Sequence, residues 1–176
     1  MSSFIKRQFN GWLIPFFSSK GYSALNDSAR SKPLITPYGK AGFLICNQAA
    51  IPEAAAKQVK KGAEFLMNMS NDVWFNDTYI VQTHYYYARL RAVESRKDIA
   101  INCNNGFSGL INASGEIVEK EKSTEPFVRM VAIQPNKYVT IASLYPGLFI
   151  YGCAIYIALI MIAAFTKRQA KNSQQP

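Results

Sequence analysis

Hydrophobic and polar positions divide the chain into two unlike parts. From Tyr138 to Thr166 the sequence carries no charged side chain, and its densest apolar stretch covers residues 148–165. About 20 apolar residues suffice to cross ~30 Å of hydrocarbon at 1.5 Å per residue. A buried core helix of this length would rarely lack a charge. We therefore predict a transmembrane helix within residues 138–166.

The flanks of this span predict its orientation. Lys167, Arg168 and Lys171 follow it directly, and basic residues next to a span mark the cytoplasmic side. Residues 167–176 would then form a cytoplasmic tail, and the soluble part would face the periplasm of a bacterial inner (cytoplasmic) membrane. Met1 to Lys20 holds no apolar run long enough for a signal peptide. The route of export therefore stays open.

Ahead of the span, short apolar runs alternate with helical stretches. Residues 1–40 are rich in Pro, Gly and Ser and are predicted to be loop-rich, with one short strand at Phe4–Ile5. Helices are predicted from Pro52 to Lys61 and over 78–97, the first framed by proline in its first turn and glycine at its end. Strands are predicted at 41–46, 63–69, 99–102, 109–112 and 127–133. This alternation predicts an α/β layered domain.

Composition narrows the function classes. The 176 residues include 49% hydrophobic and 18% charged residues, which favours a folded chain of one domain over disorder. The net charge of +9 comes from basic residues interspersed with apolar ones, so it favours an anionic lipid surface over nucleic acid. Three cysteines do not pair evenly, and no Cys or His spacing suggests zinc. No metal or cofactor is expected.

Cys46 is the first candidate for chemistry. It stands at the C-terminal end of a predicted strand, before a tight turn and a helix. A cysteine held there is exposed, and nearby backbone N–H groups and a helix N-terminus favour its thiolate. The alternative is a structural cysteine that packs as a small hydrophobe, and position alone favours that alternative.

A wider series of motifs changes this balance. Its members, in chain order, are Leu44–Gln48 around the cysteine, Gly62–Ala63 before a strand, Ser70–Phe75, Gln82–His84, Ala88–Glu94 and Asn104–Gly106 followed by a Gly-Glu-Ile turn. Together they resemble the C-terminal half of apolipoprotein N-acyltransferase, a family of membrane enzymes in the nitrilase superfamily. The resemblance runs from about Gly42 to the end of the chain and is looser over residues 4–41.

The resemblance implies an α/β fold, the back half of a nitrilase-like αββα sandwich followed by one C-terminal transmembrane helix. The corresponding organisation is a loop-rich segment at 1–40, a nitrilase-like half domain at 41–137, the span at 138–166 and the tail at 167–176. The family's N-terminal membrane bundle and the first half of its domain have no counterpart here.

The resemblance also assigns site residues. Cys46 matches the family's nucleophile, and Lys6 is a candidate for the lysine that stabilises the oxyanion, on a partial match around Phe4–Lys6. Asn71, Asp72 and Trp74 fall in a loop beside the family's pocket, although Asp72 could instead fix the loop. Gln48, a further pocket candidate, stands where the family has a glutamate. No carboxylate precedes Lys6 to act as the general base.

Two functions remain open. In the first, the chain transfers an acyl group from a phospholipid to the N-terminal amine of a lipoprotein through a Cys46 thioester, once another chain supplies the front half and its glutamate. In the second, the chain is a catalytically inactive accessory or structural subunit of a membrane complex. Both predict another membrane protein chain as partner, because half a sandwich exposes an apolar sheet face. Phospholipid and a lipoprotein are the other expected partners.

Overall fold

The computed structural model describes residues 32–75, 78–122 and 125–172, with side chains up to Thr166. Its strands are β1 (Leu34–Thr36), β2 (Gly39–Ile45), β3 (Phe65–Asn71), β4 (Ile99–Asn104), β5 (Phe107–Ile111) and β6 (Ile117–Lys122). Its helices are α3 (Pro52–Lys60), α4 (Tyr79–Ser95), α5 (Ile141–Leu144) and α6 (Leu148–Asn172), with the short 3-10 turns η1 (Cys46–Ala50) and η2 (Val73–Phe75).

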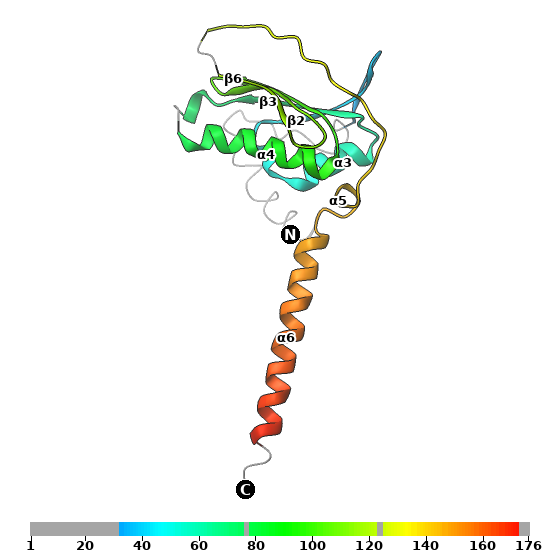
Figure 1. The fold of residues 1–176 in the computed structure, drawn as a ribbon, viewed down its shortest axis with the longest axis vertical. Helices are drawn as coiled ribbons and strands as arrows, with labels where there is room; N and C mark the ends of the chain where they lie inside the picture. Colours follow the sequence, from blue (N-terminus) through cyan, green and yellow to red (C-terminus); the bar gives the residue numbers. More distant parts are fainter. Residues whose placement is uncertain (1–31, 76–77, 123–124, 173–176) are drawn as a thin grey trace, which may run out of the picture. The chain divides into compact units, whose positions relative to one another are not determined.

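The six strands form one sheet in chain order, β1 to β6. β2, β3 and β4 run parallel, with α3 and α4 as their crossovers, while the outer pairs are antiparallel. Parallel strands end at the same edge of a sheet, so the residues after β2, β3 and β4 meet there. Figure 1 shows α3 and α4 on one face of this sheet.

The core lies between the sheet and these helices. Leu44, Leu66, Ile99 and Ile111 project from the strands, and Ala88 and Ala92 of α4 pack against them. Small residues on α4 let the helix approach the sheet closely. Tyr85, also buried, donates a hydrogen bond from its hydroxyl to the carbonyl of Glu119 and so ties α4 to β6.

The opposite face of the sheet is only partly covered. The pairing register aligns Phe43 with Met67, and Ile45 with Met69, on the side away from the core residues Leu44 and Leu66. Ile45 is 54% exposed and Met69 is 45% exposed. The α/β half domain expected from the sequence is therefore confirmed. One face of its sheet packs on helices, and the other carries an apolar stripe.

Most predicted elements are present, with four differences. β1 and β6 were not predicted, one predicted strand is absent, and the helix predicted over 138–166 begins only at Leu148, because the chain first forms the separate α5. The other predicted helices and the strands at 41–46, 63–69, 99–102 and 109–112 are present with ends shifted by one to two residues. The strand predicted at 127–133 is wrong, since the described residues there form no ladder and the last strand is β6. β1 adds a short strand within the segment predicted to be loop-rich. The predicted strand at Phe4–Ile5 lies outside the described residues.

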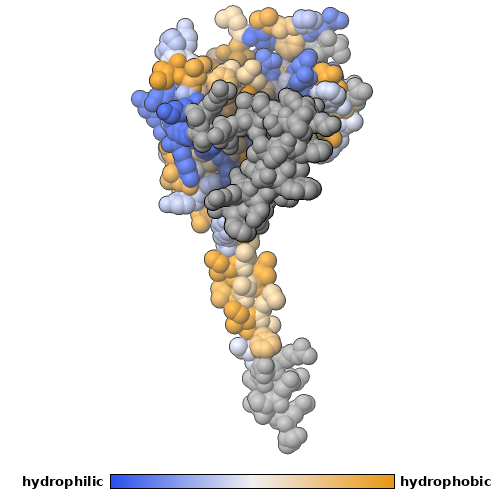
Figure 2. Space-filling model, turned by 180° about the vertical axis from the view of Figure 1, so that it is seen from behind, coloured by the Kyte–Doolittle hydropathy of each residue, from blue (hydrophilic) through white to orange (hydrophobic). Residues whose placement is uncertain are grey.

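α6 contains the apolar stretch predicted to span a membrane. Leu148–Thr166 is a helix of 19 residues, long and apolar enough to cross a bilayer, and none of it is buried against the rest of the protein. In Figure 2 the side chains along this stretch are mostly orange, at the hydrophobic end of the scale, with paler ones among them. At 1.5 Å per residue this stretch is about 28 Å long, close to the thickness of the hydrocarbon core.

Candidate active site

Cys46 lies at the C-terminal end of β2, where the chain turns sharply into η1. Its φ of 50° falls in the left-handed region, which non-glycine residues rarely adopt. The side-chain oxygen of Gln48 accepts a hydrogen bond of 2.9 Å from the backbone N–H of Ile45 and braces the turn from inside. Strain of this kind costs about 1–3 kcal/mol and clusters at functional sites. The turn presents a partly exposed thiol at the edge of the sheet.

The loop after β3 holds the three other predicted pocket residues. β3 pairs with β2 so that Met69 faces Ile45, which places Asn71, Asp72 and Trp74 along the same sheet edge as Cys46. Asn71 accepts a hydrogen bond of 3.2 Å from the N–H of Val73 and starts the turn. Trp74 is 87% exposed on η2. The large indole is therefore available to contact a substrate or a second chain.

Asp72 is buried beneath this loop. Its Oδ1 accepts a hydrogen bond of 2.7 Å from the Ser70 hydroxyl and lies 3.1 Å from Nδ1 of His84 on α4. The Asp72 backbone N–H donates to the carbonyl of Asn104 at the end of β4. The Asp72 side chain is 1% exposed, its carboxylate contacts two side chains and its backbone is bonded to β4, so Asp72 is placed to position the loop. Of the two roles expected for Asp72, the structure supports loop fixing.

Phe75 completes the anchorage of the loop. Its ring meets the His84 imidazole edge to face, with centroids 5.3 Å apart. His84 therefore touches the loop on one side through Asp72 and on the other through Phe75. The single histidine of the chain joins α4 to the loop that carries Trp74.

Asp72, His84 and Cys103 form a cluster at the edge of the sheet. Cys103, near the end of β4, is the member that the sequence did not single out. Burial, and then the negative charge of Asp72, raise the pKa of its thiol to about 11. A thiol with this pKa stays protonated near neutral pH and is a poor nucleophile. Gly106 leaves room for it, because a Cβ there would overlap the Cys103 sulfur. The polar residues that end three consecutive parallel strands were the available signal for this cluster.

The structure brings together all but one of the predicted site residues. Cys46, Gln48, Asn71, Asp72 and Trp74 lie on one edge of the sheet, with Gln48 bonded to the backbone of the turn. Lys6 lies outside the described residues. Among the described residues, no three His, Cys, Asp or Glu side chains are grouped so that they could hold a metal ion.

A cavity of about 500 Å³ lies beside the cluster, against β4, β5, β6 and the segment that follows β6. Its lining residues include Asn102, Ser108, Glu119 and Glu121. Arg129 also lines the cavity and forms an ion pair of 2.9 Å with Glu121. The cavity is open and polar, and its position on the partly covered face leaves it accessible.

Comparison with known proteins agrees with the resemblance seen in the motifs. The carbon-nitrogen hydrolase family model matches residues 6–142. An apolipoprotein N-acyltransferase of Geobacter metallireducens is 25% identical over 158 residues, 89% of this chain and 30% of that protein. One of Bdellovibrio bacteriovorus is 34% identical over 87 residues, 48% of this chain and 16% of that protein. The chain thus spans less than a third of the length of these relatives.

A solved structure shows the same fold. The carbon-nitrogen hydrolase of Helicobacter pylori superposes with a TM-score of 0.52 at 23% identity, over 61% of this chain and 44% of that one. The match confirms the expected nitrilase-like α/β half domain, which α6 follows. The family model covers most of the residues, and the fold agrees with it. The chain belongs to the carbon-nitrogen hydrolase family.

Proposed function

We propose that the chain supplies the nucleophile half of an acyltransferase site that uses phospholipid as acyl donor and the N-terminal amine of a lipoprotein as acceptor. The observation that carries the proposal is the left-handed turn at Cys46, at the end of β2 and one strand from the Asp72 loop. A cysteine held in this way forms covalent acyl intermediates in a two-step transfer. The donor and acceptor are those that the resemblance to apolipoprotein N-acyltransferases implies, and relatives of that name support the proposal.

In the first step the Cys46 sulfur attacks the ester carbonyl of the phospholipid, and a base removes the thiol proton. The tetrahedral intermediate collapses to a thioester and a lysophospholipid, whose alkoxide takes up the proton. In the second step the amine attacks the thioester, forms an amide and returns the thiol. Backbone N–H groups at the turn, with Lys6, would stabilise the oxyanion in both steps.

We propose that a partner chain supplies the base, because the described residues close to Cys46 offer none. Asp72 is already bonded to Ser70 and His84 under the loop, and Gln48 is neutral. Loss of a general base lowers a rate by about 10²–10⁴-fold. We therefore expect the chain by itself to be almost inactive and to depend on a partner that carries a glutamate.

The sheet face that the described residues cover only in part is where this partner would bind. Phe43, Ile45, Met67 and Met69 form an apolar stripe next to the Cys46 turn. An exposed stripe of this kind marks an interaction site in a stable protein. A membrane protein chain that provides the front half of the sandwich would cover the stripe and bring its glutamate to Cys46.

A second candidate function is a catalytically inactive accessory subunit that uses the same stripe. The side chain of Gln48 favours it, because the position that the resemblance assigns to a glutamate holds an amide whose oxygen braces the backbone of the turn. Such a chain would retain the partner and the membrane anchor without acyl transfer.

Acyl-adduct analysis separates the two functions. The full chain is purified from membranes in mild detergent with its bound proteins, and the Cys46 peptide is examined by mass spectrometry. An acyl adduct that hydroxylamine removes, that persists in Cys103→Ala and that is lost in Cys46→Ala supports the acyltransferase. A stable complex without any adduct contradicts it and supports the accessory subunit.

For location, we propose that α6 crosses the bacterial inner membrane with its C-terminus in the cytoplasm and the domain in the periplasm. The basic residues after the span support this orientation. C-terminal fusions test it: a fluorescent protein that matures in the cytoplasm should glow, and alkaline phosphatase should stay inactive. The reverse pair of results would invert the topology.

A further inference from the structure

The segment between the domain and α6 is clamped to the end of α4. The Lys97 ammonium, fully buried, donates hydrogen bonds to the Asn136 carbonyl at 2.6 Å and to Asn136 Oδ1 at 2.7 Å. Further along, the Thr140 hydroxyl donates to the carbonyl of Glu94. Hydrogen bonds to a buried charge are among the stronger ones in proteins. This segment is thus a fixed part of the domain rather than a loose linker.

Only three residues separate this clamped segment from the span. α5 ends at Leu144 and α6 begins at Leu148, and the N–H of Leu148 donates to the carbonyl of Tyr145. Even a fully extended chain covers at most about 3.5 Å per residue, so α5 lies within roughly 15 Å of the start of the span. α3, which packs on α5, is held near the same level.

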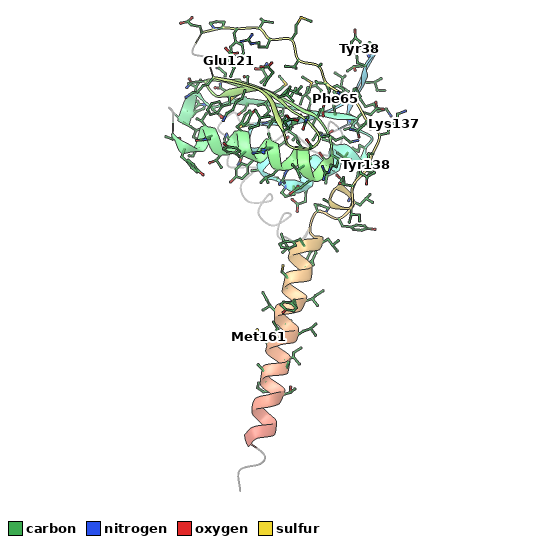
Figure 3. All side chains as sticks on the ribbon, in the orientation of Figure 1. Tyr38, Phe65, Glu121, Lys137, Tyr138 and Met161 are labelled. Atoms are coloured by element: carbon green, nitrogen blue, oxygen red, sulfur yellow. The ribbon has the colours of Figure 1, made fainter. Side chains whose placement is uncertain are left out.

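Apolar and aromatic side chains of this segment point into solvent. Tyr138, Ile141, Leu144 and Tyr145 are all exposed, and they directly precede the apolar stretch of α6. Tyrosine at the end of a span settles at the level of the lipid headgroups. Figure 3 shows Lys137 and Tyr138 at the end of the domain where Phe65 begins β3.

Basic residues surround the same end of the domain. Lys60 ends α3 and Lys61 follows it, and Lys40 lies beside them, with its Nζ 3.8 Å from the place of a Cβ on Gly62. Arg96, after α4, is exposed and accepts a hydrogen bond at its carbonyl from the Asn136 amide. The nearby acids are Glu53 on α3, Glu64 before β3 and Glu94 on α4, and Glu94 is paired with Arg91, so basic groups predominate.

We propose that the domain docks onto the anionic headgroups of the bilayer that α6 crosses. The docking surface, here named the membrane collar, consists of residues 137–145 together with Lys40, Lys60, Lys61 and Arg96. The inference rests on the span in the proposed function. Each basic residue near an anionic leaflet contributes about 1 kcal/mol, or about fivefold in the docking equilibrium. The tyrosines and Ile141 add apolar contact. Docking would hold the Cys46 edge at a fixed height above the phospholipid.

Hydrogen exchange on the full chain tests the collar. The protein is reconstituted in nanodiscs of phosphatidylcholine alone or with phosphatidylglycerol, and amide exchange is followed by mass spectrometry. We expect slower exchange over residues 137–145 and at the end of α3 in the anionic discs. In the double variant Lys60→Glu with Lys137→Glu, the difference in exchange between the two kinds of disc should shrink more than tenfold. Lys122→Glu on β6 should keep the difference.

Two other outcomes overturn the inference in different ways. Docking on anionic lipid is refuted if exchange is equal in the two lipids, or if the double variant Lys60→Glu with Lys137→Glu keeps the difference. In that case α6 still resists carbonate extraction, so the span is unaffected. Release of the chain from membranes by alkaline carbonate refutes the span itself, and with it the collar. The acyl-adduct experiment on Cys46 is independent of both.

Discussion

Oδ1 of Asp72 lies 3.1 Å from Nδ1 of His84, twelve residues further along the chain, and this contact connects the loop after β3 to α4. We expect Asp72→Asn to lower the free energy of unfolding by about 1–3 kcal/mol, because a buried hydrogen-bonded charge is replaced by a weaker partner. Thermal unfolding in detergent measures the change. Asn71→Ala, on the exposed side of the same loop, should cost much less, and equal losses would show that Asp72 does not anchor the loop.

The sequence could predict the position of Cys46 but not the Asp72–His84 contact. The apolar run of β2 stops abruptly at residue 46, which is a local signal. The contact depends on how α4 returns over the sheet, which no local pattern specifies. The strand predicted at 127–133 failed for a related reason: its β-branched residues satisfy propensity, but a strand also needs a neighbour to share a ladder. β1 was missed because three residues are too few for a periodic signal.

Cys46 and Cys103 should differ in reactivity. The pKa of Cys103 is raised to about 11 by burial and by Asp72, so at neutral pH we expect iodoacetamide to label Cys46 faster. Asp72→Asn removes the nearby negative charge and should lower the Cys103 pKa, which makes Cys103 easier to label. Mass spectrometry of the two peptides over a pH series measures both effects. Faster labelling of Cys103 in the unchanged protein near neutral pH would contradict this assignment.

The raised pKa of Cys103 also predicts that stability depends on pH. The Cys103 pKa is higher in the folded chain than the ordinary value of 9.0, so the unfolded chain loses this proton first as the pH rises. The free energy of unfolding should therefore fall as the pH rises from about 9 to about 11. Cys103→Ser should weaken this fall in alkaline denaturation curves, whereas Cys153→Ser on α6 should leave it unchanged.

Two glycines provide a matched test of packing at the site. A Cβ on Gly106 would overlap the Cys103 sulfur and lie 3.1 Å from Asp72 Oδ2, whereas a Cβ on Gly152 in α6 would meet no atom within 4 Å. We expect Gly106→Ala to lower stability by about 1–3 kcal/mol, as overpacking does, and to raise the labelling of Cys103. Gly152→Ala should do neither, and an unchanged melting temperature in Gly106→Ala would show that the cluster is loosely packed.

The exposed stripe on the sheet predicts separate effects on binding and on folding. Met69 is 45% exposed and pairs with Ile45 across β2 and β3, so Met69→Lys should leave the stability of the isolated chain within about 0.5 kcal/mol, as surface changes do. The same change places a charge in the centre of the proposed partner contact. We therefore expect loss of the co-purified chain in pull-down and of the Cys46 adduct. Ile80→Lys, at an equally exposed position on α4, should retain both, and loss in both variants would place the partner elsewhere.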